Sequence, residues 1–133
     1  MARDAKKLQQ KYLELQVIDQ QMKQLQRQLQ LIESQMMEVT MTKEALNELG
    51  AVSKGTEMLA PISGGIFVRA NLADSNKLAV NVGAGTVVEK TIPEVIRIME
   101  EQESEIRKTY NSLAEELQKL GEKALEIQEE LSK

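Results

Sequence analysis

The chain has 133 residues, contains no cysteine, histidine or tryptophan, and is only 2% aromatic. It therefore lacks the commonest zinc ligands, the commonest general base and the thiol nucleophile. The formal net charge is −4, and no basic stripe of the kind that phosphate backbones require is present, so nucleic-acid binding is disfavoured.

The N-terminus shows no apolar segment of the signal-peptide type, and no apolar run approaches the ~20 residues that span a bilayer. The absence of cysteine fits a reducing compartment. We therefore expect a soluble, cytoplasmic protein without membrane contact.

A first helix is predicted from about residue 3 to about residue 49, in an N-terminal coiled-coil region of residues 1–50. Outward positions are rich in Gln, Lys and Glu, which form helices well, and Gly50 is the first helix-breaking residue. Two interleaved apolar series repeat every seven positions, which predicts a narrow seam against a partner helix in a left-handed supercoil. The series are Leu8, Leu15, Met22, Leu29, Met36 and Ile18, Leu25, Ile32, Val39, Leu46.

Within residues 51–92, the segments 66–72 and 77–82 each carry an apolar residue at every second position, a pattern of period two that predicts strands, and segments 57–62 and 86–90 flank them. Turn-forming segments at 63–65, 73–76 and 83–85 divide this region into four strands, which we expect to form two hairpins of one small sheet. Pro61 cannot donate a ladder hydrogen bond, so its strand is expected to lie at an edge or to be bulged there.

Four short strands leave exposed edges and an apolar face, which is a pairing and aggregation hazard. A barrel completed by strands of other chains removes both problems. We therefore predict obligate oligomerisation through residues 56–92. The apolar strand residues assigned to subunit assembly are Met58, Ile66, Phe67, Val68, Leu72, Leu78, Val80, Val82, Val87 and Val88.

A second helix is predicted from the segment 91–93 onward, where Thr91 can cap it and Pro93 suits its first turn, in a C-terminal coiled-coil region of residues 93–133. Its apolar seam is interrupted only by Glu103, and Gly121 in its interior is expected to loosen the last turns. The fold class is therefore mainly α with a small β region: a long antiparallel two-helix coiled coil joined by two β-hairpins that contribute to an oligomeric β-barrel.

No active site emerges from the sequence. Paired glutamates such as Glu115 and Glu116 fall on outward helix positions, where a solvated face explains them. The segment 83–85, GAG, resembles the start of a dinucleotide fingerprint, but it lacks the third glycine and precedes a strand, which favours a hairpin turn. We predict that the protein is not an enzyme and binds no cofactor or metal.

Apolar residues also gather near the free end of the helix pair, where both termini meet and fraying is expected. They fit two interpretations: ordinary coiled-coil packing with scattered surface residues, or a mobile apolar surface for partners that lack defined structure. Met37 and Met41 instead could pad the junction between helices and barrel. The residues assigned to this client-binding surface are Leu8, Tyr12, Leu13, Leu15, Leu120, Leu125, Ile127 and Leu131.

The chain resembles a known family over essentially its whole length. Two segments of the middle region are the most specific part of this resemblance. They are 61–70, PISGGIFVRA, and 80–90, VNVGAGTVVEK. With two hairpins between long helices, the chain closely resembles the alpha subunits of prefoldin, especially the archaeal type.

The resemblance implies a chaperone that works without ATP hydrolysis. Two alpha and four beta subunits would join through a double β-barrel, and the coiled-coil ends would hold unfolded proteins and deliver them to a group II chaperonin. Two alternatives stay open: a structural coiled-coil scaffold that pairs with a defined partner helix, and an accessory domain of an enzyme. The second lacks an attached catalytic region within these residues.

Overall fold

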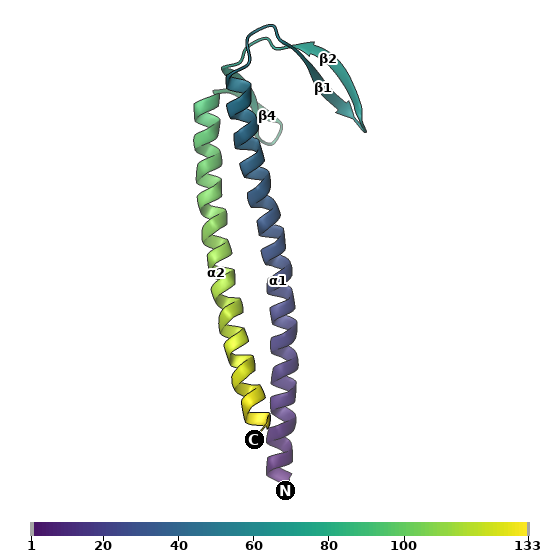
Figure 1. Ribbon diagram of the computed structural model, residues 1–133, viewed down its shortest axis with the longest axis vertical. Helices are drawn as coiled ribbons and strands as arrows, with labels where there is room; N and C mark the ends of the chain where they lie inside the picture. Colours follow the sequence, from purple (N-terminus) through teal and green to yellow (C-terminus); the bar gives the residue numbers. More distant parts are fainter. Residues whose placement is uncertain (1, 133) are drawn as a thin grey trace. The chain divides into compact units, whose positions relative to one another are not determined.

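The computed structural model describes residues 2–132, apart from the side chains of Ala2 and Arg3. Two long helices flank four short strands along the chain, which confirms the predicted fold class (Figure 1). The elements are α1 (Ala2–Gly50), β1 (Glu57–Ser63), β2 (Ile66–Asn71), β3 (Lys77–Gly83), β4 (Thr86–Thr91) and α2 (Ile92–Ser132).

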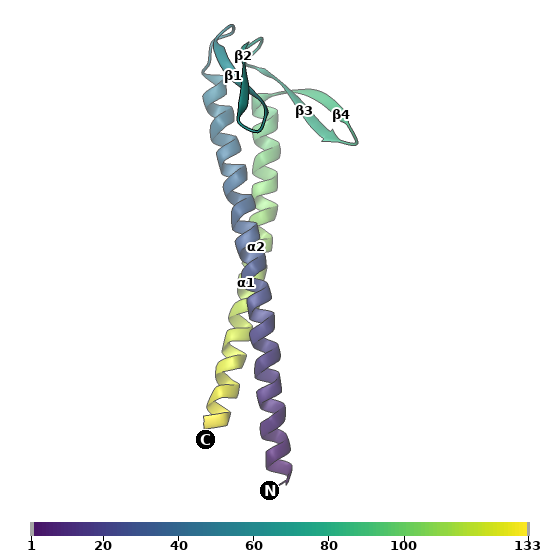
Figure 2. The ribbon, with the colours of Figure 1, turned by 90° about the vertical axis from the view of Figure 1, so that its right-hand side faces the viewer.

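The chain divides into two compact units, each of which contains part of both helices. The terminal unit comprises Met1–Met37 and Ser104–Lys133, and the central unit comprises Glu38–Glu103. Within the terminal unit α1 and α2 lie side by side and run antiparallel, as Figure 2 shows from a second direction. The described part of the terminal unit is therefore a single antiparallel helix pair.

A narrow apolar seam holds the helices of the terminal unit together. Ile18, Leu25 and Ile127 are buried, most other seam residues, such as Ile32 and Leu113, are half-buried, and Leu8 at the start of α1 is exposed. Two helices alone can cover just one stripe of each other, so a thick core cannot form. The stability of this unit depends on that stripe.

The strands form two separate two-stranded sheets, β1–β2 and β3–β4. The prediction of one small sheet was therefore wrong, because among the described residues no ladder joins β2 to β3. Both sheets are antiparallel hairpins with the same register: Glu57 pairs with Asn71, and twenty residues later Lys77 pairs with Thr91. The second hairpin thus repeats the geometry of the first.

Each hairpin closes through a two-residue loop with positive φ at both positions. The values are 48° and 82° at Gly64 and Gly65, and 52° and 74° at Ala84 and Gly85. Such turns match the right-handed twist of paired strands. The segment 83–85 therefore acts as a hairpin turn.

The pairing register shifts between Pro61 and Ser63, and again between Asn81 and Gly83. The prediction that the strand with Pro61 is bulged is therefore confirmed. A bulge leaves one extra residue out of the ladder and increases the local twist.

The start of α2 is fixed by a cap and by packing in the central unit. The Glu94 amide donates to Thr91 Oγ1 at 3.3 Å, which confirms Thr91 as the capping residue. Ile92 and Val95 behind it are buried. A β-carbon on Gly50 would lie 3.7 Å from Ile92 Cδ1, so the end of α1 and the start of α2 pack closely.

Polar contacts cross between the helices inside each unit. In the central unit Lys43 Nζ lies 2.6 Å from Glu103 Oε2, and the two side chains are only 24% and 19% exposed. This pair explains why Glu103 interrupts the apolar seam. In the terminal unit the Tyr110 hydroxyl donates to Glu33 Oε1 at 3.1 Å, and this hydrogen bond raises the pKa of Tyr110.

We expect Glu103→Ala to destabilise the protein, because it leaves the half-buried ammonium of Lys43 without this carboxylate. The expected loss is about 1–2 kcal/mol, measured by thermal unfolding followed by circular dichroism. The control is Glu105→Ala, which removes an exposed carboxylate that pairs with Lys108 on the same helix at 3.7 Å. Equal losses in the two variants would contradict a structural role for the seam pair.

Candidate functional site

The hairpins expose apolar side chains on both faces. Residues opposite each other in an antiparallel pair point to the same side, so Met58, Ile66 and Val68 share one face of the first hairpin, and Leu59 and Phe67 share the other. All five are exposed, Ile66 by 61% and Phe67 by 56%. A two-stranded sheet with so much apolar surface is marginal in water on its own.

The second hairpin is less exposed on one of its faces. Leu78, Val80 and Val88 are half-buried, as is Leu72 in the segment between the hairpins, whereas Val82 and Val87 are exposed. Among the described residues every strand also pairs along only one edge. The residues predicted for assembly therefore combine apolar faces with unpaired backbone groups.

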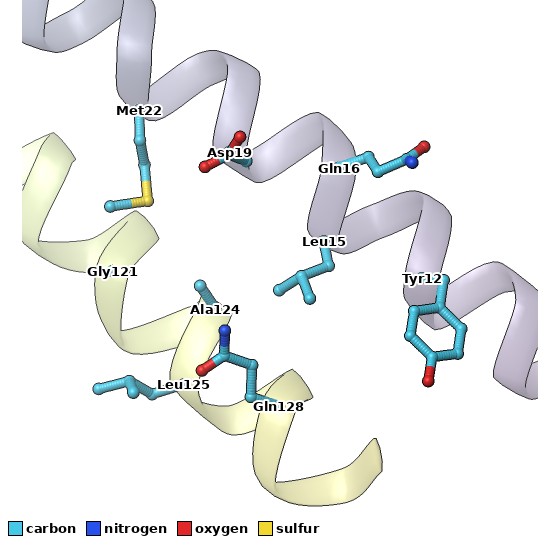
Figure 3. A pocket seen from close by; sticks show the side chains of 9 residues that line it. All are labelled: Tyr12, Leu15, Gln16, Asp19, Met22, Gly121, Ala124, Leu125 and Gln128. Atoms are coloured by element: carbon cyan, nitrogen blue, oxygen red, sulfur yellow. The ribbon is translucent and has the colours of Figure 1, made fainter. Parts of the chain in front are cut away.

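The second candidate surface lies where α1 begins and α2 ends, which we call the tip (residues 4–22 and 120–132). A shallow groove of about 510 Å³ runs along the helix pair there (Figure 3). It is lined by Tyr12, Leu15, Gln16, Asp19, Met22, Gly121, Ala124, Leu125 and Gln128.

This groove exists because α2 contributes small residues to its floor. Ala124 occupies a seam position where a larger residue would fill the space. Gly121, about one helical turn before it, has no side chain. A β-carbon on Gly121 would lie 3.7 Å from Met22 Cε, which is an ordinary contact distance. The missing side-chain volume leaves Leu15 and Met22 accessible from the groove (Figure 3).

A second groove of about 580 Å³ lies on the other flank of the seam, as the helical spacing of its α1 residues requires. Its rim carries both a carboxylate, Glu14, and an ammonium, Lys123. The lining residues are Gln10, Leu13, Glu14, Val17, Ile18, Gln21, Leu120 and Lys123. The tip therefore offers apolar surface on both sides of the helix pair.

The structure separates the residues predicted for client binding into three groups. Leu8, Tyr12, Leu13 and Leu125 are exposed, and Leu15, Leu120 and Leu131 are half-buried. Ile127 is only 6% exposed, and its part in client binding stays a prediction. It packs in the seam because the helix pair stays closed at this level.

Sequence reasoning missed the role of Gly121 and Ala124 as the floor of a groove. The available signal was a small residue at a seam position beside a glycine. The helix α2 continues through Gly121 to Ser132, and the expectation that Gly121 loosens the last turns stays a prediction. A helical glycine costs backbone entropy but keeps its hydrogen bonds.

In residues 2–132 no group of three or more Asp or Glu side chains is placed to hold a metal ion. None of the described helices combines the length and apolar character that crossing a membrane needs.

Met37 and Met41, the two residues that could pad the junction between helices and barrel, are exposed.

Comparison with known proteins identifies close counterparts of this architecture. A family model described as prefoldin subunit matches residues 18–133. A prefoldin subunit alpha from Pyrococcus horikoshii is 34% identical over 97% of this chain and 90% of its own length. Another from Archaeoglobus fulgidus is 29% identical over 96% of this chain and 93% of its own length.

A solved structure has the same fold. The cryo-EM structure of filamentous PFD from Methanocaldococcus jannaschii superposes with a TM-score of 0.79 at 16% sequence identity. The match covers 90% of this chain and 98% of the other.

We expect Gly121→Ala to stabilise the helix pair by up to about 1 kcal/mol, because alanine has the higher helix propensity and the new methyl group meets Met22 without a clash. Thermal unfolding followed by circular dichroism measures the change. The matched control is Gly65→Ala, which places alanine at a φ of 82° and should destabilise by about 1–2 kcal/mol. Stabilisation by both variants would contradict the packing argument.

Proposed function

The chain belongs to the prefoldin family of chaperone subunits, and on that premise we propose that it is an ATP-independent holdase subunit. It binds unfolded proteins at its tip in the cytoplasm and passes them to a group II chaperonin. The single observation that carries this proposal is the pair of apolar grooves at the tip, with Tyr12 and Leu125 exposed beside one and Leu13 and Val17 lining the other.

Shallow grooves suit weak capture of many different sequences. Burial of one client side chain is worth about 1.5–3 kcal/mol at most, so a single tip holds a client briefly. Several tips acting on one unfolded chain raise the effective concentration and hence the avidity. Release then needs only competition from another binder, and hydrolysis is unnecessary.

We further propose that residues 51–92 assemble the subunit with beta-type prefoldin subunits into a hexamer of two alpha and four beta chains. Residues 1–50 and 93–133 then form the free coiled coil. The exposed faces of the first hairpin and the unpaired strand edges support this assignment, because strands from neighbouring chains would cover both.

A defined partner helix is the alternative occupant of the tip. Such a helix would fill the grooves with one fixed sequence, whereas a holdase accepts unrelated unfolded chains. Crosslinking from the tip to several unrelated denatured proteins supports the holdase. Crosslinking to one folded partner only would favour the scaffold.

The double variant Tyr12→Ser/Leu125→Ser should weaken client capture with little effect on folding, because both side chains are more than half exposed. We expect the concentration of complex that halves client aggregation, followed by light scattering, to rise about tenfold, which corresponds to about 1.4 kcal/mol of lost apolar contact.

The matched control is Leu31→Ser, which removes another exposed apolar residue of α1 that lines neither groove. This variant should suppress aggregation as the unmodified protein does. If the double variant also suppresses aggregation normally while the complex stays intact, client binding at the grooves is refuted.

A further inference from the structure

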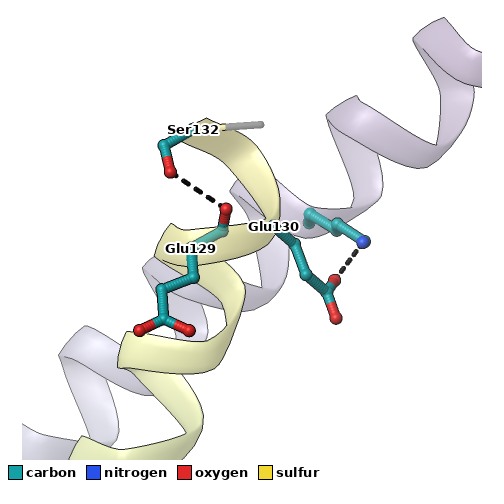
Figure 4. A network of polar contacts seen from close by, with 4 residues as sticks. Glu129, Glu130 and Ser132 are labelled. Atoms are coloured by element: carbon teal, nitrogen blue, oxygen red, sulfur yellow. Dashed lines mark hydrogen bonds and ion pairs between the residues drawn. The ribbon is translucent and has the colours of Figure 1, made fainter.

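An ion pair joins the two helices at the tip. Lys11 Nζ contacts Glu130 Oε2, and Figure 4 marks this contact at the last turns of α2. The side chains are 36% and 54% exposed, so the pair lies at the rim of the seam. It is one of the contacts between the end of α2 and α1, beside the packing of Ile127 in the seam.

The charges around this pair are mostly of opposite sign on the two helices, with Asp4 and Glu14 on α1 and Lys123 on α2 as the exceptions. The first turns of α1 carry Lys6 and Lys7 in addition to Lys11, and the last turns of α2 carry Glu126 and Glu129 in addition to Glu130. Each set has the same sign as the dipole of its own helix end, which disfavours it there. Each set is attracted to the other helix, because the antiparallel arrangement brings the two ends together.

The pair lies in the same turns of α2 as apolar residues that clients could use. Ile127 precedes Glu130 by one helical turn and is buried, and Leu131 follows it and is half-buried. If the last turns of α2 move away from α1, both side chains become accessible and extend the grooves already open at the tip.

We propose that Lys11 and Glu130, supported by the neighbouring lysines and glutamates, form an ionic clasp that holds the tip closed, and that its opening exposes Ile127 and Leu131. The consequence for client capture rests on the proposed function, whereas the clasp itself does not. The clasp regulates how much apolar surface the tip presents.

The clasp is weak enough to be adjustable. Partly exposed ion pairs change an equilibrium by roughly 1.4- to fivefold, and salt screens them over about 8 Å at physiological ionic strength. Rising salt should therefore shift the tip gradually toward the open state. A change of that size tunes client access without unfolding the helix pair.

The test measures the tip directly in the assembled complex. The chain has no cysteine, so Gln9→Cys/Ser132→Cys places two spin labels at the tip, and pulsed electron paramagnetic resonance gives the distribution of distances between them. We expect the population at long distance to grow about two- to fivefold between 0.05 and 0.5 M NaCl. Lys11→Glu should produce that population already at low salt.

Two variants separate the clasp from a general effect of charge. Lys11→Glu/Glu130→Lys restores the pair with reversed signs and should return the distances toward the closed state. Lys23→Glu makes the same charge change at a lysine whose partner, Asp19, lies on its own helix at 3.2 Å, and should leave the distances unchanged. If neither salt nor Lys11→Glu changes the distances between the spin labels, the clasp is refuted.

Client binding gives a separate result. Under the proposed function, Lys11→Glu should lower the concentration of complex that halves client aggregation. If the labels separate but aggregation is unaffected, the clasp stands and its role in client capture is refuted. Helix content measured by circular dichroism should be equal in all variants. Equal helix content shows that the labels separate because the tip opens and not because the helices unfold.

Discussion

The fold depends on one constraint: within the described residues, the two hairpins can neither pair all of their strand edges nor cover all of their apolar faces. Each strand pairs along a single edge, and the first hairpin exposes Ile66 on one face and Phe67 on the other. Neither face can turn inward, because a two-stranded sheet has no interior. Under the proposed assembly, strands from other chains would satisfy both demands at once, through backbone hydrogen bonds at the edges and apolar contact on the faces.

The helices meet a different constraint, because they bury only a narrow stripe. The ion pair of the tip is more exposed than that of the central unit: the side chains of Lys43 and Glu103 are 24% and 19% exposed, whereas those of Lys11 and Glu130 are 36% and 54% exposed. At the tip the small residues Gly121 and Ala124 also thin the packing. The same chain therefore combines a firmly held base of the helix pair with a tip whose apolar residues remain accessible.

Period and turn chemistry made most of the fold predictable from the sequence. The heptads give the two helices, the alternation between residues 51 and 92 gives the strands, and Gly64, Gly65 and Gly85 give the hairpin loops. The separation into two sheets was not predictable, because local alternation says nothing about which strand edges pair with each other. The periodicity of apolar side chains shows which face of a strand is apolar, but it does not show which strand lies beside it.

The candidate site was predictable only in part, for a similar reason. Apolar residues off the seam, such as Leu13 and Leu125, could be recognised as exposed from spacing alone. The burial of Ile127 and the groove over Gly121 depend on how far the helix pair stays closed, which is set by contacts between segments distant in sequence. The Lys11–Glu130 pair is one such contact.

The native mass of the protein tests the central claim most directly. With a beta-type prefoldin partner, the chain should be found in a multi-subunit complex, and Ile66→Lys/Phe67→Lys should release it as a helical monomer, because two charges would enter apolar contacts. Ala73→Lys, which adds a charge between the hairpins, should leave the mass unchanged. A monomer that keeps its strands protected from amide hydrogen exchange, without any partner chain, would contradict the account.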